Sequence, residues 1–149
     1  MPTIDFNGLP TLVGQEVGVS DWVQITQERV NQFAEATGDF QWIHVDVERA
    51  TREMGGPIAH GYLTLSLIPF LSKGLLNITG VARGINYGSD KVRFTNMVRV
   101  GKRVRVRQKL LAVEPRAGGL QLRNEFTVEI EGEDKPACVA ETLTIFFAG

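Results

Sequence analysis

The sequence predicts an α+β protein in which an antiparallel sheet curls around one long, buried helix. Residues 61–76 are apolar on nearly every side, which is typical of a helix enclosed by other structure. After Asn77 the chain reads as consecutive strands with turn signals between them, such as the acidic Gly-containing turn at 131–134. Helical signals therefore precede the strands, and this separation favours a helix packed on an antiparallel sheet. The length of 149 residues suits one core, so we expect a single domain over residues 1–149.

Helix start and stop signals divide the first part of the chain. Thr26 is a typical N-cap, and Gly38 supplies a left-handed residue that ends the helix it starts. Asp46 is placed to cap a second, short helix over residues 47–53, which a Gly-Gly-Pro loop follows. Pro69 lacks a backbone donor and is expected to bend the long helix at 61–76.

Alternating polarity predicts the strands. Residues 102–110 and 120–131 alternate strictly, as expected for strands with one buried face. Their inward residues are Val104, Val106, Gln108 and Leu110 in the first strand, and Leu122, Phe126, Val128 and Ile130 in the second. Further strands are expected at 81–87, 91–94 and 137–147.

Composition excludes several classes of protein. The net charge of −1 gives no general attraction to nucleic acid or anionic membranes, and the aromatic residues do not interleave with the basic ones. The single cysteine, Cys138, excludes an internal disulfide framework and fits a reducing cytoplasm. The N-terminus lacks a basic region followed by an apolar run, and the apolar stretch at 62–76 is interrupted by polar residues. We therefore expect a cytoplasmic protein with no signal peptide or membrane span.

Asp39 and His44 are the first candidates for chemistry. Asp39 is the first side chain after the helix stop, and His44 follows five residues later in the same turn region. Histidine accepts protons near neutral pH, and a neighbouring carboxylate can orient it or stabilise its charge. From spacing alone, an alternative is that Asp39 only shapes the turn and His44 only bonds to a backbone group.

Three motifs give a resemblance to a known family. The segment Gly38-Asp39-Phe40-Gln41-Trp42-Ile43-His44, followed by Ala50, resembles the hydratase motif of the MaoC-like, R-specific enoyl-CoA hydratases (hydratase 2). Pro-Ile-Ala-His-Gly at 57–61 resembles the second landmark of that family, and Asn86-Tyr87-Gly88 with 91–94 resembles its strand after the helix. Gln41-Trp42 replaces the usual Asn-Pro pair, as in the NodN-like members of the group.

The resemblance implies a hot-dog fold and a hydro-lyase of the enoyl-CoA hydratase 2 type. Such an enzyme interconverts (R)-3-hydroxyacyl-CoA and trans-2-enoyl-CoA, with Asp39 and His44 jointly holding the water. It implies an acyl-CoA substrate, no metal, no cofactor beyond the coenzyme A of the substrate, and a homodimer whose sheets pair edge to edge. A different reaction on the same fold, that of an acyl-CoA thioesterase, stays open. The altered Gln41-Trp42 pair also keeps open a non-catalytic acyl-thioester-binding subunit.

Gly61 is the expected oxyanion-binding residue. The first N–H groups of a helix lack intrahelical partners and lie at its positive end, where an enolate-like oxygen would be stabilised. The alternative is that glycine only permits tight packing at the helix start. Gln41, Trp42, Asn86 and Tyr87 are expected to contact substrate, although the last two could equally be packing residues of a strand.

Two other groups invite a functional interpretation. His60 could join His44 and Asp46 in a metal site, but two histidines and one cysteine offer no close ligand cluster, so we expect no metal and a structural His60. The basic row Arg103, Arg105, Arg107 and Lys109 could meet the phosphates of coenzyme A. Cross-strand ion pairs with the acidic row of residues 125–131 are the simpler expectation.

Overall fold

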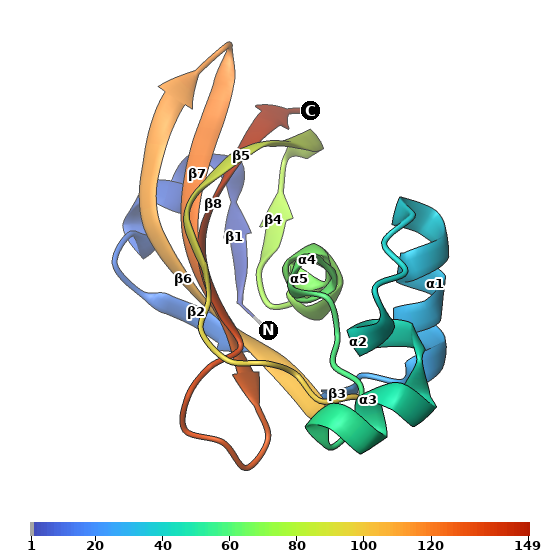
Figure 1. The fold of residues 1–149 in the computed structure, drawn as a ribbon. Helices are drawn as coiled ribbons and strands as arrows, with labels where there is room; N and C mark the ends of the chain where they lie inside the picture. Colours follow the sequence, from blue (N-terminus) through green and yellow to red (C-terminus); the bar gives the residue numbers. More distant parts are fainter. Residues whose placement is uncertain (1) are drawn as a thin grey trace.

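The computed structural model describes residues 2–149 and has the hot-dog fold, an antiparallel sheet curved around a central helix. Figure 1 shows the sheet on one side, α4 and α5 seen end-on inside its curve, and α1 to α3 beyond them. The elements in chain order are β1 Thr3–Asp5, the 3-10 helix η1 Phe6–Leu12, β2 Glu16–Val19, β3 Val23–Gln24, α1 Gln27–Thr37, α2 Trp42–Val45, α3 Val47–Met54, α4 Gly61–Ser66, α5 Ile68–Leu71, β4 Asn77–Thr79, β5 Val81–Phe94, β6 Arg103–Arg116, β7 Gly119–Ile130 and β8 Cys138–Ala148.

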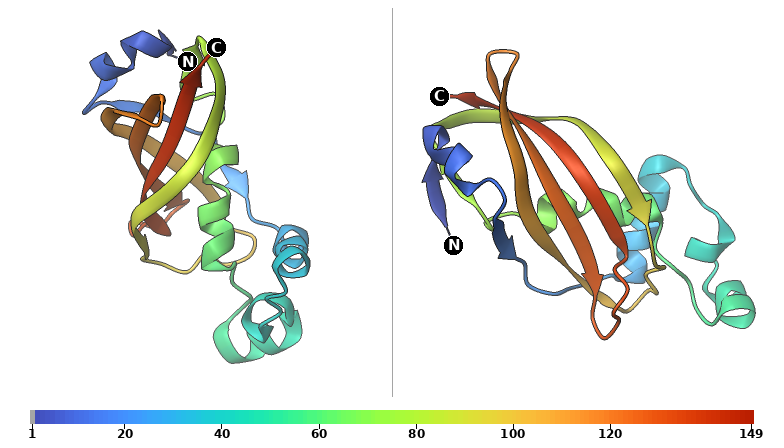
Figure 2. Two further views of the ribbon diagram at one scale, coloured as in Figure 1. Left: turned by 90° about the horizontal axis from the view of Figure 1, so that it is seen from above. Right: turned by 90° about the vertical axis from the view of Figure 1, so that its left-hand side faces the viewer.

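The main sheet contains six strands in the order β2-β6-β7-β8-β5, with β3 also paired to β6. The predicted alternation is confirmed, because the inward residues of β6 and β7 are buried. Those in the first half of β6 and the second half of β7 share a core cluster with the central helix, whereas Leu110 and Leu122 lie in a second cluster. Leu63, Ile68 and Leu71 of the helix form one core cluster with residues of these strands. Figure 2 shows the helix lying along the concave face of the sheet, with α1 to α3 gathered at one end.

The local signals for α1 and α3 are confirmed. Thr26 Oγ1 accepts a hydrogen bond from the Arg29 N–H at 3.1 Å, and Gly38 ends α1 with a φ of +82°. Asp46 caps α3 in the same way, through a 3.1 Å bond from the Arg49 N–H. The single turn α2 between them was not predicted.

The central helix is shorter than the predicted 61–76. It is interrupted at Leu67, which separates α4 from α5, and it ends at Leu71. Pro69 has no N–H to donate to the preceding turn, which accounts for the interruption. Gly74 has a φ of +85°, a left-handed conformation that the helix cannot continue through.

The two predicted strands at 81–87 and 91–94 form one strand, β5. Its pairing with β8 shifts register between Asn86 and Gly88 and again between Asp90 and Arg93, near the positive φ of Lys91. The small parallel pair of β1 and β4 was not predicted either. β5 is the last strand of the sheet path, so its outer edge has no neighbouring strand among residues 2–149.

The three arginines of the basic row of β6 form cross-strand ion pairs, which confirms the simpler expectation for them. Arg105 pairs with Glu129 at 2.7 Å, and Arg107 pairs with Glu129 at 3.0 Å and with Glu16 at 2.9 Å. Arg103 pairs with Glu131 at 2.5 Å. These contacts occupy the guanidinium groups that were considered for phosphate binding. In the part of the chain described, no helix is long and apolar enough to cross a bilayer.

Candidate active site

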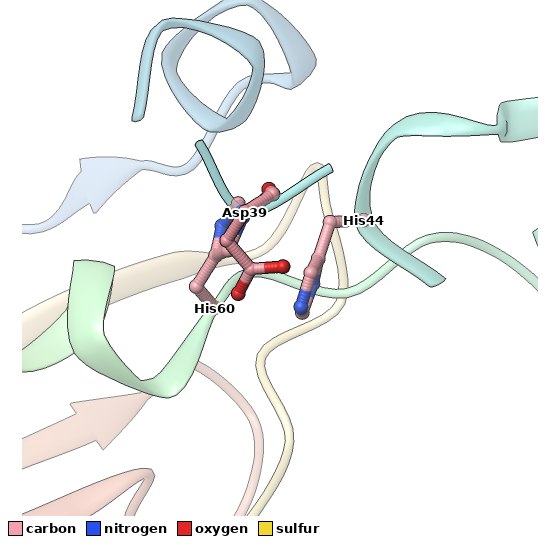
Figure 3. Close-up of side chains that lie close together, drawn as sticks. All are labelled: Asp39, His44 and His60. Atoms are coloured by element: carbon pink, nitrogen blue, oxygen red, sulfur yellow. The ribbon is translucent and has the colours of Figure 1, made fainter. Parts of the chain in front are cut away.

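Asp39, His44 and His60 meet at the end of the molecule where α4 begins (Figure 3). One ligand-type atom from each residue lies within 4.8 Å of those of the other two. Asp39 follows the end of α1, His44 lies on α2, and His60 is the N-cap of α4. The sequence predicted the meeting of Asp39 and His44. The expectation of no close ligand cluster was wrong, because His60 joins the pair.

His44 is held in one orientation by the loop before α4. Its side chain is buried, with 6% exposed, and Nδ1 lies 2.7 Å from the carbonyl oxygen of Ile58. A carbonyl can only accept, so Nδ1 carries the hydrogen and the lone pair of Nε2 is free to bind a proton. The Ile58 N–H in turn donates to the Ile43 carbonyl at 3.0 Å, which ties the two segments together.

Burial lowers the pKa of His44 below its usual range, and the charge of a protonated His60 would lower it further. The hydrogen bond to Ile58 and the Asp39 carboxylate raise the pKa of His44 but do not offset burial. His44 is therefore mostly neutral at pH 7, with its Nε2 lone pair available.

The lowered pKa of His44 predicts a loss of stability in mild acid. The unfolded chain binds this proton more readily, so the unfolding free energy should fall as pH drops below about 6.5 and through the lower pKa of the folded state. Urea denaturation at pH 7.5 and pH 5 measures the fall. It should be smaller in His44→Asn than in the wild type, and an equal fall in both proteins would contradict the assignment.

His60 supports the backbone of Asp39. Its side chain is 2% exposed, and Nε2 donates to the Asp39 carbonyl oxygen at 3.0 Å. The imidazole rings of His60 and His44 stack with centroids 3.8 Å apart and an angle of 23° between planes. The ring of Phe33 also lies near His60, with centroids 4.9 Å apart. These contacts fix the relative positions of the aspartate and the catalytic candidate His44.

The stacking of the two imidazoles disfavours a metal ion between them. Nitrogen lone pairs lie in the ring planes, and two nearly parallel planes do not meet at the ~2.0–2.1 Å that a zinc–nitrogen bond requires. One nitrogen of each ring is also engaged with a backbone carbonyl. The absence of a metal stays a prediction that metal analysis can test.

The Asp39 carboxylate is exposed, and its turn is preserved despite the altered motif. Asp39 Oδ1 accepts a hydrogen bond from the Gln41 N–H at 3.2 Å, an Asx-type turn that does not require Asn-Pro. Gln41 is exposed beside Asp39, while the Trp42 ring is covered by the Arg49 guanidinium at 4.0 Å. The substrate contacts expected of Gln41 and Trp42 stay predictions.

Gly61 lies at the first position of α4, directly after His60. Among residues 2–149, its N–H has no hydrogen-bond acceptor. A Cβ at this position would lie 3.1 Å from the ring of Phe94, so the glycine also allows a close approach of strand β5. Both expected features of Gly61, the unpaired amide and the tight packing, are therefore present.

A cavity of about 690 Å³ lies between the central helix and the inner face of the sheet. Asn86, which was expected to contact substrate, lines this cavity, and that contact stays a prediction. Tyr87 does not line it, because its ring lies under the Arg116 guanidinium, 4.3 Å away, and its hydroxyl bonds to that group. Two lining residues that were not predicted as site residues are Gln108 and Asn124. Each is a polar residue in an otherwise apolar inward row of its strand, and this pattern could have identified both as site candidates from the sequence.

Comparison with known proteins gives consistent similarities. Residues 9–128 match the family described as MaoC like domain. The chain is 51% identical over 142 residues to 3-hydroxyacyl-thioester dehydratase Z of Mycobacterium tuberculosis (strain H37Rv), covering 94% of each chain. It is 45% identical to nodulation protein N of Rhizobium meliloti, covering 97% of this chain and 92% of the relative. The fold resembles the R-hydratase PhaJ1 of Pseudomonas aeruginosa with a TM-score of 0.73 at 24% identity, covering 92% of this chain and 83% of that one.

Proposed function

Because the chain belongs to the MaoC-like domain family, we propose that it is an (R)-specific enoyl-CoA hydratase and 3-hydroxyacyl-CoA dehydratase. A relative at 51% identity is named a 3-hydroxyacyl-thioester dehydratase, which supports a dehydratase or hydratase activity for this chain. We propose in addition that the thioester is carried by coenzyme A, that the product has the R configuration, and that Asp39, His44 and Gly61 act in the reaction. Water is the only other reactant, and we propose that no metal or organic cofactor takes part.

The observation that carries the proposal is the pairing of Asp39 with a neutral His44. Their ligand-type atoms lie within 4.8 Å, and the bond from His44 Nδ1 to Ile58 leaves Nε2 as an acceptor. An exposed carboxylate and an imidazole lone pair at this separation can both hydrogen-bond one water molecule. Such a water is oriented for attack and has a base beside it.

The proposed hydration step moves one proton and one hydroxide. His44 Nε2 accepts a proton from the water, and the oxygen forms a bond to the β-carbon as the alkene electrons shift toward the thioester carbonyl. The Asp39 carboxylate stabilises the imidazolium that forms, which then gives the proton to the α-carbon on the same face. Dehydration is the reverse path. Both side chains act on the same water in this step, and their ligand-type atoms lie within 4.8 Å, so the pair acts as a unit.

Gly61 is proposed to hold the thioester carbonyl oxygen. Negative charge develops on that oxygen as the enolate-like intermediate forms, and a preorganised N–H stabilises it. The Gly61 N–H has no acceptor within residues 2–149 and follows directly on His60, whose ring contacts His44 and Asp39. His60 therefore connects the two parts of the site, because it contacts the Asp39–His44 pair and directly precedes the Gly61 amide.

A direct assay tests the proposed function. Purified protein mixed with crotonyl-CoA should consume the enoyl absorbance and produce (R)-3-hydroxybutyryl-CoA, which a chiral separation identifies. Free thiol, measured in parallel with a thiol reagent, should not appear. Release of coenzyme A would indicate a thioesterase instead, and binding without any turnover would indicate a non-catalytic subunit.

We further propose that the protein works as a homodimer paired along β5. This strand runs 14 residues at the edge of the sheet, and its exposed side chains include Ile85, Tyr87 and Phe94. A long edge strand with exposed apolar residues favours pairing with another chain. Sedimentation should give the dimer mass for the wild type and the monomer mass for Ile85→Arg; a monomeric wild type would contradict the proposal.

A further inference from the structure

The cavity between the central helix and the sheet is unusual in its mixed chemistry. Its walls include apolar residues such as Leu65, Ile68 and Phe126, as expected for an acyl-chain site. None of its lining residues is charged. Its polar lining residues are Ser66, Ser72, Asn86, Ser89, Gln108, Asn124, Thr142 and Thr144. The cavity therefore offers uncharged hydrogen-bonding groups, whereas a plain hydrocarbon chain would bind better to a wholly apolar wall.

Gln108 and Asn124 form the buried centre of this polar surface. Gln108 is 8% exposed and Asn124 is 5% exposed, and they lie diagonally across the β6–β7 pairing. Gln108 Nε2 donates to Asn124 Oδ1 at 3.0 Å. That bond uses one amide N–H group and one carbonyl. Within residues 2–149, Gln108 Oε1 and Asn124 Nδ2 have no hydrogen-bond partner.

The remaining amide groups form a matched donor and acceptor at the cavity wall. Reversing both amide orientations would exchange the roles but would still leave one carbonyl oxygen and one NH₂ group unpaired. Neither atom is among the fully enclosed side-chain atoms that lack a partner, so both keep some contact with solvent, and both residues line the cavity. An alkyl chain placed against them would remove their access to water and give no hydrogen bond in return.

The cavity is placed to receive the far part of an acyl chain. Its lining on the helix begins at Leu65, one turn after Gly61 and therefore ~6 Å further along the axis. It continues past Ile68 to Ser72 and across to strands β5 to β8. An acyl group whose carbonyl lies at Gly61 would thus extend along the helix toward Gln108 and Asn124, a placement that rests on the proposed function.

We propose that this protein selects acyl thioesters whose chain carries an uncharged oxygen substituent, such as a hydroxyl group, that bonds to Gln108 and Asn124. A hydroxyl can donate to the free carbonyl oxygen and accept from the free NH₂ group at the same time. Sites built to hydrogen-bond a substrate group reject the analogue that lacks it, because their own polar groups are then left unpaired. The absence of charged residues from the lining disfavours a carboxylate at this point.

Binding of saturated thioesters tests the inference without requiring turnover. Calorimetry compares the binding of octanoyl-CoA with that of four hydroxyoctanoyl-CoA regioisomers, which carry the hydroxyl at carbon 5, 6, 7 or 8. At least one regioisomer should bind about tenfold more tightly than octanoyl-CoA, as one well-placed hydrogen bond to otherwise unpaired groups provides. If octanoyl-CoA binds as tightly as every regioisomer, or if none of the five binds, the inference is overturned.

Paired substitutions identify the residues responsible. Replacing both amides, in Gln108→Leu with Asn124→Leu, should abolish the preference or reverse it toward octanoyl-CoA. Gln121→Leu is the matched control, because Gln121 is also a buried amide of β7, with 7% exposed, but does not line the cavity. It should keep the wild-type preference. If the double variant still prefers the hydroxylated chain as the wild type does, the assignment to Gln108 and Asn124 is overturned. If the double variant does not fold, the binding comparison with the wild-type protein still tests the inference.

The two proposals fail in different ways. A protein that prefers a hydroxylated chain but hydrates no enoyl-CoA would contradict the proposed function and leave the chain selectivity intact. A protein that hydrates crotonyl-CoA but binds octanoyl-CoA at least as tightly as every regioisomer would contradict only the selectivity.

Discussion

Asp39→Asn and His44→Asn are each expected to lower kcat/KM for hydration of crotonyl-CoA by about 10²–10⁴-fold, the usual contribution of a positioned acid or base. Asp39→Asn keeps an acceptor for the Gln41 N–H but removes the negative charge. His44→Asn keeps an amide N–H near the position of Nδ1, facing Ile58, but removes the lone pair of Nε2. The loss should appear mainly in kcat, because both groups act on the water rather than on the bound thioester.

The double substitution should cost little more than the more damaging single one, since groups that act as a unit are not additive. Asp46→Asn is a suitable control. Asp46 lies in the same segment and caps α3, a role that asparagine fills equally well, so its activity should stay near that of the wild type. If either substitution of the Asp39–His44 pair kept activity within threefold of the wild type in a folded protein, the proposed mechanism would be wrong.

Gly61→Pro is the second substitution from which we expect a large effect. Proline has no N–H, and removing an oxyanion donor typically costs about 10²–10³-fold in kcat. The position tolerates proline structurally, because it is the first residue of α4 and the preceding His60 has an extended conformation (φ −60°, ψ 139°). The backbone can therefore stay in place while the donor is lost.

Gly61→Ala separates the donor from the packing. Both substitutions add a Cβ that would lie 3.1 Å from the ring of Phe94, but only alanine keeps the N–H. Any cost of displacing Phe94 is common to both variants, so Gly61→Ala should lose far less activity than Gly61→Pro. Steady-state kinetics with crotonyl-CoA measure the two. Equal losses would show that Gly61 serves packing alone.

Sequence patterns predicted those parts of the fold that depend on local chemistry. The N-caps Thr26 and Asp46 and the left-handed Gly38 are each decided by one side chain and its neighbouring backbone, and all three are confirmed. The inward rows of β6 and β7 follow from period-two burial. The continuity of β5 was missed, because register shifts interrupt its alternation.

The long helix was predicted too long because apolar composition does not stop at a helix end. Leu75 follows Leu71 at helical spacing, so the pattern still indicates a helix there. The sequence also does not show that Gly74 has a positive φ, because an interior helical glycine gives the same pattern. The parallel pairing of β1 with β4 joins segments that are more than 70 residues apart, which local patterns do not encode.

The candidate site was predicted in part. The spacing of Asp39 and His44 after a helix stop indicated that they could meet, and the family motif gave that pair a chemical meaning. The stacking of His60 on His44 depends on how the α4 loop packs against α2, a tertiary contact between residues 16 positions apart. The amide pair of Gln108 and Asn124 depends in the same way on the register of β6 and β7.

A crystal structure of the Asp39→Asn variant with crotonyl-CoA bound tests the central claim most directly. It should show one water hydrogen-bonded to Nε2 of His44 and to the side chain at position 39, facing the β-carbon. The thioester oxygen should lie about 2.7–3.1 Å from the Gly61 nitrogen. A thioester bound with its carbonyl away from Gly61, or a water held by only one of the two side chains, would contradict the mechanism.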